Sequence, residues 1–550
     1  MRPVTLFVVN LLSGFLFVQE ADAQEEKYPT TSIEPYYDLQ FTEAERDSMQ
    51  SSLEEFLAEY KAIHSYPLDN SDGMSLLFNP YPPGFAGDSG QRPIVWGLPK
   101  EVSLPGSKSE IAFLPLYKLA GLVQTRKVTS TQLTTLYLDR LKKFGSVLQC
   151  VVTVLEERAL AQARKADEEI AAGHYRGPLH GIPYGVKDLL AVKGTKTTWG
   201  AMPYKDQVID ETATVVQKLD EAGAVLVAKL TMGALAMGDI WYGGVTKNPW
   251  DLDQGSSGSS AGSASATAAG LVAFSIGTET WGSIVSPSTR CGVTGLRPTY
   301  GLVSRHGAMA LSWSMDKIGP ICRSALDCAL VFDAIRGPDG KDLSVREASF
   351  NYDAGAGIQS LKIGYLKKLF DLDTINRDRN QKTLEVIRKM GITLKEASLP
   401  EGIPVSALSI ILGAEAGAAF DELTRSDRDS LLVNQRKNAW PNNFRSFRFI
   451  PAVEYVNALR IREVLIRKYH EVTSEFDILV APTFGGDQLL MTNLTGHPCL
   501  VLPNGFDEKG RPASISLLGR LQGEAALISL GRAIQESTAW EDRHPPLFIK

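Results

Sequence analysis

The stretch GSSGSSAGSASATAAGLVAFSIGTETWGSIVSPSTRCGVTGLRP, residues Gly255–Pro298, decides the fold, and it is crowded with Ser, Gly and Ala. Side chains this small let one backbone come close to another backbone or to a ligand. Runs of Ser and Gly are often linkers. Here, however, apolar runs at Ala264–Ile276 and Val293–Leu296 belong to the same stretch. We therefore expect this part of the chain to be folded and to build a site.

Strand-like and helix-like patterns alternate on both sides of this stretch. Apolar runs of the buried-strand type and helix-forming runs follow one another at Arg158–Ala172 (helix), Ile182–Val186 (strand), Thr214–Gly223 (helix), Ala224–Ala228 (strand), Ser263–Gly270 (helix) and Val272–Ile276 (strand). This alternation predicts an α/β fold, in which a sheet is covered by helices on both faces.

The rest of the chain is arranged around this body. Residues 24–111 are predicted to form an N-terminal extension, with a helix from Thr42 to about Ala62 and then an irregular segment rich in Pro, Gly and Asp. Residues 112–540 are predicted to form the main domain. Its helix-rich part, at about 370–470, is expected to be a cap over the edge of the sheet, and residues 541–550 a C-terminal tail.

The first 23 residues have the pattern of an export signal. Arg2 precedes a mostly apolar run, Val4–Val18, and Ala21–Ala23 is a small-x-small cleavage pattern before Gln24. The alternative is an N-terminal membrane anchor, for which the apolar run is short. We therefore expect an exported protein, periplasmic or secreted, with no stable membrane association after cleavage of residues 1–23.

Charge and cysteine content narrow the function further. The chain has 57 Lys and Arg against 63 Asp and Glu, a net charge of −6, which argues against a nucleic-acid-binding surface. The five cysteines form no CxxC pair and suit no common zinc site. They are either small buried core residues or, in an exported chain, include one oxidised pair. They are Cys150, Cys291, Cys322, Cys328 and Cys499.

Two ways of activating a serine nucleophile are open. None of the seven histidines stands in a context that marks a base, and Gly255–Ser259 differs from the G-x-S-x-G elbow of Ser-His-Asp hydrolases. The other way is a lysine whose pKa is lowered by burial. Lys187 fits, because the apolar run Ile182–Val186 carries it into the sheet. The competing interpretation has Lys187 reaching solvent or paired with Asp188.

Ser259 and Ser283 are the candidate hydroxyl groups, and each lies at a tight turn flanked by glycine. Thr280, Trp281, Gly282 and Ser283 can present successive backbone N–H groups to an oxyanion, as acyl transfer requires. We hypothesise that Lys187, Ser259 and Ser283 form one catalytic unit.

Several motifs in a fixed order resemble the amidase signature family, over roughly residues 112–540. That family has a GIPxxVKD run, a GGSSGGS-like run, a GTDxGGS-like run and a CGxxGLKPTxG-like run, and its two key serines have the same separation as Ser259 and Ser283. Here the corresponding runs are Gly181–Asp188, Ser257–Ser263, Gly277–Ser283 and Cys291–Gly301, and the match continues through Met315–Pro320 to residues 476–536.

The resemblance implies a single large domain with a mixed, twisted sheet, and it implies a role for each site residue. Ser283 is the nucleophile that forms an acyl-enzyme. Ser259 bridges it to the base Lys187, after a cis peptide bond at Gly258. Ser260 supports the network, and the backbone N–H groups of Thr280 to Ser283 form the oxyanion hole. Neither a metal nor an organic cofactor is needed.

Three positions depart from the family pattern. Trp281 replaces a glycine or small residue beside the nucleophile, Glu279 stands where aspartate is common, and Val285 stands where many members have arginine. The last change resembles the branch that contains peptide amidases. We expect the substrate pocket to be built from residues 184–245 and 405–460 and to be apolar or aromatic. Its wall would include Tyr184 and Trp281, and other aromatic candidates are Trp241, Trp313 and Trp440.

The resulting prediction is an exported amidase that hydrolyses the carbon–nitrogen bond of a small-molecule carboxamide and is a monomer or homodimer. One alternative is an amidotransferase A-type subunit, which releases ammonia from glutamine for tRNA-dependent amidation and works with partner subunits. The export pattern at residues 1–23 counts against it, because tRNA and ATP are cytosolic. Another alternative is a catalytically silent binding protein on the same fold.

Overall fold

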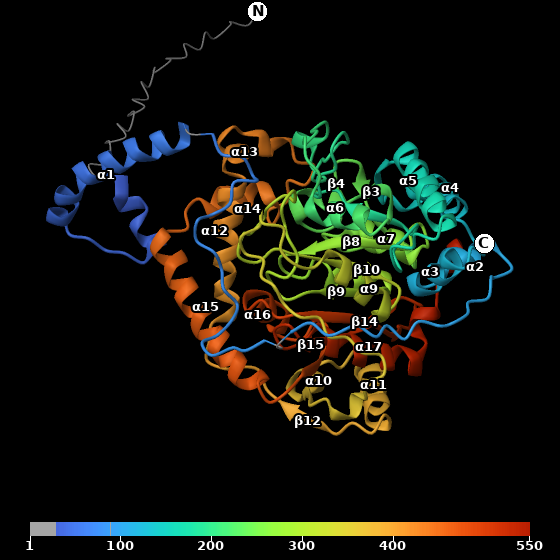
Figure 1. Ribbon diagram of the computed structural model, residues 1–550. Helices are drawn as coiled ribbons and strands as arrows, with labels where there is room; N and C mark the ends of the chain where they lie inside the picture. Colours follow the sequence, from blue (N-terminus) through green and yellow to red (C-terminus); the bar gives the residue numbers. More distant parts are fainter. Residues whose placement is uncertain (1–28, 66, 88–89, 550) are drawn as a thin grey trace, which may run out of the picture. The chain divides into compact units, whose positions relative to one another are not determined.

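The computed structural model describes residues 29–65, 67–87 and 90–549 (Figure 1). The chain divides into two compact units, Met1–Leu68 (unit 1) and Asp69–Lys550 (unit 2). The predicted export signal at residues 1–23 lies outside the described residues, so it stays a prediction.

In the described residues of unit 1 there is one long helix, α1 (Glu43–Ser65), preceded by two short 3-10 turns. The Thr42 backbone N–H and hydroxyl donate to the Glu45 carboxylate at 2.7 and 2.8 Å. The Glu45 N–H donates back to the Thr42 hydroxyl at 3.4 Å, so the two residues cap the helix reciprocally. The helix predicted from Thr42 to about Ala62 is confirmed.

Unit 2 is built on a mixed sheet. Among the described residues this sheet has eleven strands, in the order β1-β3-β2-β8-β10-β9-β14-β15-β13-β11-β12. Their bounds are β1 (Val151–Val154), β2 (Pro183–Lys187), β3 (Val225–Leu230), β8 (Phe274–Glu279), β9 (Thr294–Arg297), β10 (Lys317–Cys322), β11 (Ile363–Leu366), β12 (Leu394–Ala397), β13 (Ile478–Pro482), β14 (Cys499–Phe506) and β15 (Pro512–Gly519). Strand β2 runs parallel to β3 and β8, β11 runs parallel to β12 and β13, and the other neighbouring pairs are antiparallel.

Two small hairpins precede β8. Strands β4 (Ile240–Trp241) and β5 (Gly244–Val245) form one hairpin, and β6 (Lys247–Asn248) and β7 (Asp251–Gly255) form the other. The second hairpin delivers the chain directly into the Ser/Gly stretch.

Helices cover both faces of the sheet. As a result, every residue of β2, β3, β8 and β10 is buried, whichever face its side chain lies on. The predicted α/β fold is therefore confirmed. The helices that contact the strands of the sheet are α4 (Ser130–Leu148), α5 (Glu156–Ala171), α6 (Thr214–Glu221), α7 (Ala261–Ala268), α8 (Val285–Cys291), α9 (Ala325–Ile335), α10 (Lys367–Leu372), α11 (Arg377–Lys389) and α17 (Glu524–Thr538). Helix α2 (Lys108–Phe113) packs on α4, α3 (Leu116–Gln124) packs on α9, and α16 (Gln488–Leu494) packs on the 3-10 turn Val405–Ser409.

Helix α7 explains why the central stretch needs small residues. All eight of its residues are buried. A Cβ atom at Gly262 would lie 2.5 Å from the Cys150 carbonyl oxygen and from the Thr231 nitrogen, and one at Gly277 would lie 2.8 Å from the Ser260 hydroxyl oxygen. The stretch is therefore a packed interior element that brings Ser259 and Ser260 against β8.

The helix-rich region is smaller than predicted. Strand β12 falls inside the predicted cap at 370–470, yet it is an edge strand of the central sheet. The helices after it lie together on one side of unit 2 (Figure 1), away from α4 and α5. They are α12 (Ile410–Ala419), α13 (Asp421–Arg425), α14 (Trp440–Phe447) and α15 (Ala452–Thr473).

The structure differs from the predicted boundary between residues 111 and 112. Residues 69–111 belong to unit 2, because side chains tie them to the body. The Asn70 amide donates to the Ala310 carbonyl at 3.0 Å and accepts from its N–H at 2.7 Å. At the other end of the chain, Phe548 of the predicted tail is fully buried, and its carbonyl accepts from Arg140 at 2.8 Å.

All five cysteines are buried free thiols, which agrees with the core interpretation. In the part of the chain that the structure describes, no helix has the length and apolar character needed to cross a bilayer.

Candidate active site

Lys187 is the last residue of β2 and is fully buried. Its Nζ lies 2.8 Å from the Ser259 hydroxyl oxygen, 2.9 Å from the Thr278 hydroxyl oxygen and 3.2 Å from the Ser260 hydroxyl oxygen. The strand thus ends by placing an amine against the two serines that immediately precede α7. Of the two interpretations of Lys187, the buried one is correct.

Burial lowers the pKa of Lys187 from its usual 10.5 to about 7, against the opposing attraction of Asp316 and Glu279. The neighbouring Asp188 does not pair with Lys187. Its Oδ1 lies 2.9 Å from Nζ of Lys229 on β3, and both of those side chains are fully buried. Lys187 therefore exchanges its proton near neutral pH, and Asp188 is neutralised by another lysine.

The Gly258–Ser259 peptide bond is cis, as the resemblance implied. A Cβ atom at Gly258 would lie 1.8 Å from the Gly238 carbonyl oxygen, so no larger residue fits there. The Ser259 carbonyl accepts a hydrogen bond from the Gly233 N–H at 3.3 Å. The loop around residues 233–238 therefore holds the backbone that presents Ser259.

Ser260 links the lysine to the end of β8. Its hydroxyl donates to the Thr278 carbonyl at 3.0 Å and accepts from the Thr278 N–H at 3.1 Å. Its backbone N–H donates to the Ser283 carbonyl at 3.1 Å. This last bond brings the Ser283 turn beside Ser259. Among the described residues, no hydrogen bond joins the Ser259 and Ser283 hydroxyls directly.

The turn from Thr280 to Ser283 exposes its backbone donors. Within the described residues, none of its four N–H groups donates to a protein acceptor. Gly282 has a φ of 83°, a conformation that favours glycine, and Ser283 is 8% exposed. A substrate carbonyl that reaches Ser283 therefore meets donors that the fold itself does not use.

Glu279, the last residue of β8, holds this turn in place, a role that the motif analysis did not assign. Its Oε2 accepts the N–H groups of Ile284 and Val285 at 2.8 and 2.9 Å. Its Oε1 accepts from Arg297 Nη1 at 2.7 Å and from Asn493 at 2.9 Å. Burial alone raises the pKa of Glu279, but Arg297 and these hydrogen bonds hold it at about 2.

The sequence did contain a signal for this network. Glu279 and Arg297 are an acid and a base that stand inside two of the family-like runs, Gly277–Ser283 and Cys291–Gly301. What could not be read was their mutual contact, which depends on the antiparallel pairing of β8, β10 and β9.

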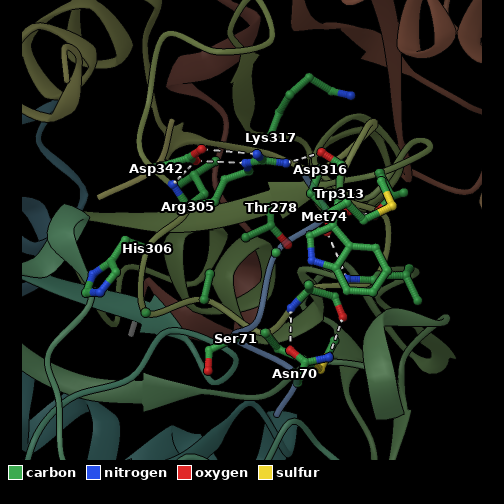
Figure 2. A pocket seen from close by; sticks show the side chains of 18 of the residues that line it. Asn70, Ser71, Met74, Thr278, Arg305, His306, Trp313, Asp316, Lys317 and Asp342 are labelled. Carbon is green, nitrogen blue, oxygen red and sulfur yellow. Dashed lines mark hydrogen bonds and ion pairs between the residues drawn. The ribbon is translucent and has the colours of Figure 1, made fainter. Parts of the chain in front are cut away.

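A cavity of about 460 Å³ adjoins the relay. Its wall is formed by residues from within the segments 70–78, 300–318 and 341–343, together with Thr278 and Thr280. Figure 2 shows ten of its side chains with labels. The predicted pocket regions contribute little. Leu189 and Ala236 reach the cavity from the region 184–245, and none of its lining residues within the described chain comes from 405–460.

The aromatic predictions also need correction. Tyr184 is fully buried and stacks on Phe274, with ring centroids 5.1 Å apart, so it is a core residue rather than a pocket residue. Trp281 is 44% exposed and is not among the residues that line the cavity. Trp313 does line the cavity, whereas the indole N–H of Trp440 donates to the Leu235 carbonyl in the interior.

No histidine takes the place of the lysine. Among the described residues, none is hydrogen-bonded to Ser259 or Ser283. His306 borders the cavity, but its Nε2 lies 3.3 Å from the Glu211 carboxylate. The Ser-His-Asp alternative therefore has no geometric support.

Known proteins with similar sequences show which family this chain belongs to. The model of the family described as "Amidase" matches residues 132–491, which is more than half of the chain. The glutamyl-tRNA(Gln) amidotransferase A subunit of Moorella thermoacetica is 32% identical over 490 residues, covering 80% of this chain and all of the relative. The corresponding protein of Dehalococcoides mccartyi is 33% identical over 477 residues, covering 78% of this chain and 97% of the relative.

Solved structures of amidases also resemble this chain. The peptide amidase of Stenotrophomonas maltophilia superposes with a TM-score of 0.71 at 27% identity, covering 78% of this chain and 98% of the other. An amidase family protein of Bacillus anthracis superposes with a TM-score of 0.70 at 26% identity, covering 80% and 93%. The chain therefore belongs to the amidase family, whose enzymes carry the amidase signature and act on carbon–nitrogen bonds.

Proposed function

We propose that this chain is a serine amidase that hydrolyses a carboxamide through an acyl-enzyme on Ser283. The observation that carries the proposal is the fully buried Lys187 amine, which has a pKa of about 7 and lies 2.8 Å from the Ser259 hydroxyl oxygen. An amine in this state takes a proton at neutral pH, as an ordinary lysine does not.

The first half of the reaction forms the acyl-enzyme. The Ser283 oxygen attacks the amide carbonyl carbon while its proton passes to Ser259, and the Ser259 proton passes to the neutral Lys187 amine. The N–H groups of the Thr280–Ser283 turn stabilise the negative charge that develops on the carbonyl oxygen. When the carbon–nitrogen bond breaks, the proton held by Lys187 returns through Ser259 to the leaving nitrogen.

The second half releases the acid. A water molecule attacks the acyl carbon and gives one proton to the same Ser259–Lys187 relay. Collapse of the intermediate breaks the bond to the Ser283 oxygen, which takes the proton back. One amide and one water thus give one carboxylic acid and one amine or ammonia, and the enzyme returns to its starting state.

An active-site label tests this proposal. A fluorophosphonate probe is expected to attach to Ser283, which peptide mapping by mass spectrometry would detect, and Ser283→Ala is expected to lose both labelling and amide hydrolysis. The matched control is Ser286→Ala, at a nearby serine whose hydroxyl contacts Ser257 at 2.7 Å. Labelling at a different residue, or hydrolysis that survives Ser283→Ala, would contradict the assignment.

A second candidate is a glutamine-dependent amidotransferase subunit. The curated relatives named above carry that description at 32–33% identity along nearly their whole length, which favours this function over an exported amidase. Ammonia release from L-glutamine, faster than from any other simple carboxamide, would support it. Hydrolysis of apolar carboxamides without glutaminase activity would support the amidase.

We also propose that residues 1–23 are removed on export. N-terminal sequencing of the protein purified from its native source is expected to begin at Gln24. A mature chain that begins at Met1 would contradict this proposal and would support the amidotransferase candidate.

A further inference from the structure

A short segment before the family match, residues 70–78, is anchored at both of its ends to the rest of unit 2. At one end the Asn70 amide contacts the Ala310 N–H and carbonyl at 2.7 and 3.0 Å. At the other end the Phe78 ring packs edge-on against Tyr300, with centroids 5.0 Å apart, and the Arg462 guanidinium lies 3.5 Å above it. The family model begins at residue 132, so this segment lies outside it.

All of residues 71–77, between these two anchors, line the cavity except Asp72. We call them the wall segment. Leu76 is 68% exposed and Leu77 50% exposed, so the wall segment lies where the cavity meets solvent. In Figure 2, Asn70 with its dashed hydrogen bonds lies across the cavity from the Arg305–Asp342 pair. The cavity is therefore bounded by the body on one side and by the wall segment on another.

The cavity lies on the side of the base. Thr278 lines it, and the Thr278 hydroxyl is 2.9 Å from the Lys187 amine. In the reaction proposed above, the leaving nitrogen takes its proton from Lys187 through Ser259. This contact favours the cavity as the space that receives the departing amine.

Two of the charged groups opposite the wall segment, Arg305 and Asp316, already have partners within the fold. Arg305 Nε lies 2.9 Å from the Asp342 carboxylate. Asp316 accepts a hydrogen bond from the Thr280 hydroxyl at 2.5 Å and from the Leu311 N–H at 2.8 Å. The remaining wall is largely apolar and includes Met74, Met309, Leu311 and Trp313. A charged substituent would have to compete with these partners, whereas an apolar group of moderate size fits the volume.

We propose that the wall segment bounds the leaving-group side of the active site and selects amides whose nitrogen carries a compact, uncharged apolar substituent. This inference rests on the proposed function, because it assumes amide hydrolysis at Ser283. It adds the class of substrate, an N-substituted amide, and assigns the selection to a segment that the family model does not contain. Met74 is the specificity-determining residue within it.

Two substrate series test the inference on the full-length protein. The leaving-group series keeps the acyl part constant and compares butyramide, butyranilide and N-(2-naphthyl)butyramide. The acyl series keeps p-nitroaniline constant and compares acetyl, butyryl and hexanoyl groups. The variants are Met74→Ala, which enlarges the cavity, and Met74→Trp, which fills it. The matched control is Leu104→Ala, a 49% exposed leucine outside the cavity.

Wild type is expected to prefer the anilide to butyramide. The ratio of kcat/KM for the naphthylamide to that for the anilide should rise by about tenfold in Met74→Ala and fall by about tenfold in Met74→Trp, the effect of a small volume change in an apolar pocket. Preferences in the acyl series should stay unchanged in every variant. The Leu104→Ala profile should match wild type, and thermal unfolding midpoints would show that the variants are folded.

The possible outcomes distinguish a failure of this inference from a failure of the proposed function. Ser283-dependent hydrolysis with unmoved leaving-group ratios in Met74→Ala would overturn this inference and leave the proposed function standing. A shift in the acyl series instead would also overturn it, because the cavity would then hold the acyl part. Wild type that neither hydrolyses these amides nor reacts with a fluorophosphonate would overturn the proposed function and this inference with it.

Discussion

Lys187 and Lys229 are both fully buried lysines on neighbouring strands, and their surroundings give them different roles. Lys229 faces the Asp188 carboxylate at 2.9 Å, so its charge is compensated. The Lys187 amine instead meets hydroxyl and carbonyl oxygens, to which either protonation state can hydrogen-bond. One lysine therefore serves stability, and the other can serve as a base.

This contrast predicts opposite effects of two substitutions. Lys187→Ala is expected to lower kcat/KM for amide hydrolysis by about 10²–10⁴-fold, the usual contribution of a general base, with little loss of stability. Lys229→Ala is expected to destabilise the fold by about 3–5 kcal/mol, because it leaves Asp188 buried without its partner. Steady-state kinetics and thermal unfolding of both variants check this. Wild-type kinetics in Lys187→Ala would remove the lysine from the mechanism.

The lowered pKa of Lys187 also predicts a pH profile. The neutral amine is the active form, so kcat/KM should be low at pH 5, rise with pH and reach half of its maximum near pH 7. The rate of fluorophosphonate labelling should follow the same curve, since it uses the same base. Both are measured between pH 5 and 9 on protein shown to stay folded. A midpoint near 10, the ordinary value for lysine, would contradict a buried base.

At the scale of elements, the turn between β8 and α8 depends on one carboxylate. Glu279 receives two backbone N–H groups just after the nucleophile and is paired with the buried Arg297. It therefore fixes the direction in which the turn leaves the sheet. Because it is hydrogen-bonded to neither Lys187 nor Ser259, it acts on the reaction by positioning the turn.

Glu279→Ala is accordingly expected to lose both thermal stability and catalytic rate. It leaves Arg297 buried without its partner, which should lower the thermal unfolding midpoint by several degrees, and it loosens the donors of the Thr280–Ser283 turn, which should lower kcat more than it raises KM. Glu279→Asp keeps the charge and should restore most of both properties. Equal kcat in wild type and Glu279→Ala would show that the turn is held by other contacts.

Elements with a strong local pattern could be predicted from sequence, and contacts between distant elements could not. The apolar run Ala224–Ala228 became β3 and the capped run after Thr42 became α1, because period and end signals are local. Strand β12, Leu394–Ala397, has two exposed charged residues at its centre, so its pattern gave no sign that it pairs with β11. Edge strands of this kind are recognised by their partner rather than by their own residues.

In the candidate site, too, some parts could be predicted from the sequence and others could not. Lys187, Ser259 and Ser283 could be named from motifs and from the resemblance they carry. The cavity could not, because its wall combines residues 70–78 with residues 300–318 and 341–343, which no local pattern relates. Tyr184 and Trp281 were expected in the pocket on the strength of residue type. The structure puts one in the core and leaves the other exposed.

At the scale of the whole molecule, the chain divides into two units, and the active site is built from residues of only one of them, unit 2. Every residue of the relay, the turn and the cavity belongs to Asp69–Lys550, and so do all the buried clusters of the core. The described residues of unit 1 contribute to none of these. The wall segment, by contrast, begins only a few residues after the boundary and is part of the site.

Two truncated chains make this division measurable. A chain that begins at Asp69 keeps both anchors of the wall segment, so it is expected to fold with the unfolding midpoint of the full-length protein and to hydrolyse the same amides. A chain that begins at Tyr81 loses Asn70 and Phe78 with everything between them. It should still react with a fluorophosphonate at Ser283, because the relay is intact, but it should no longer discriminate between the anilide and the naphthylamide. Identical leaving-group preferences in the two chains would mean that the body alone shapes the cavity.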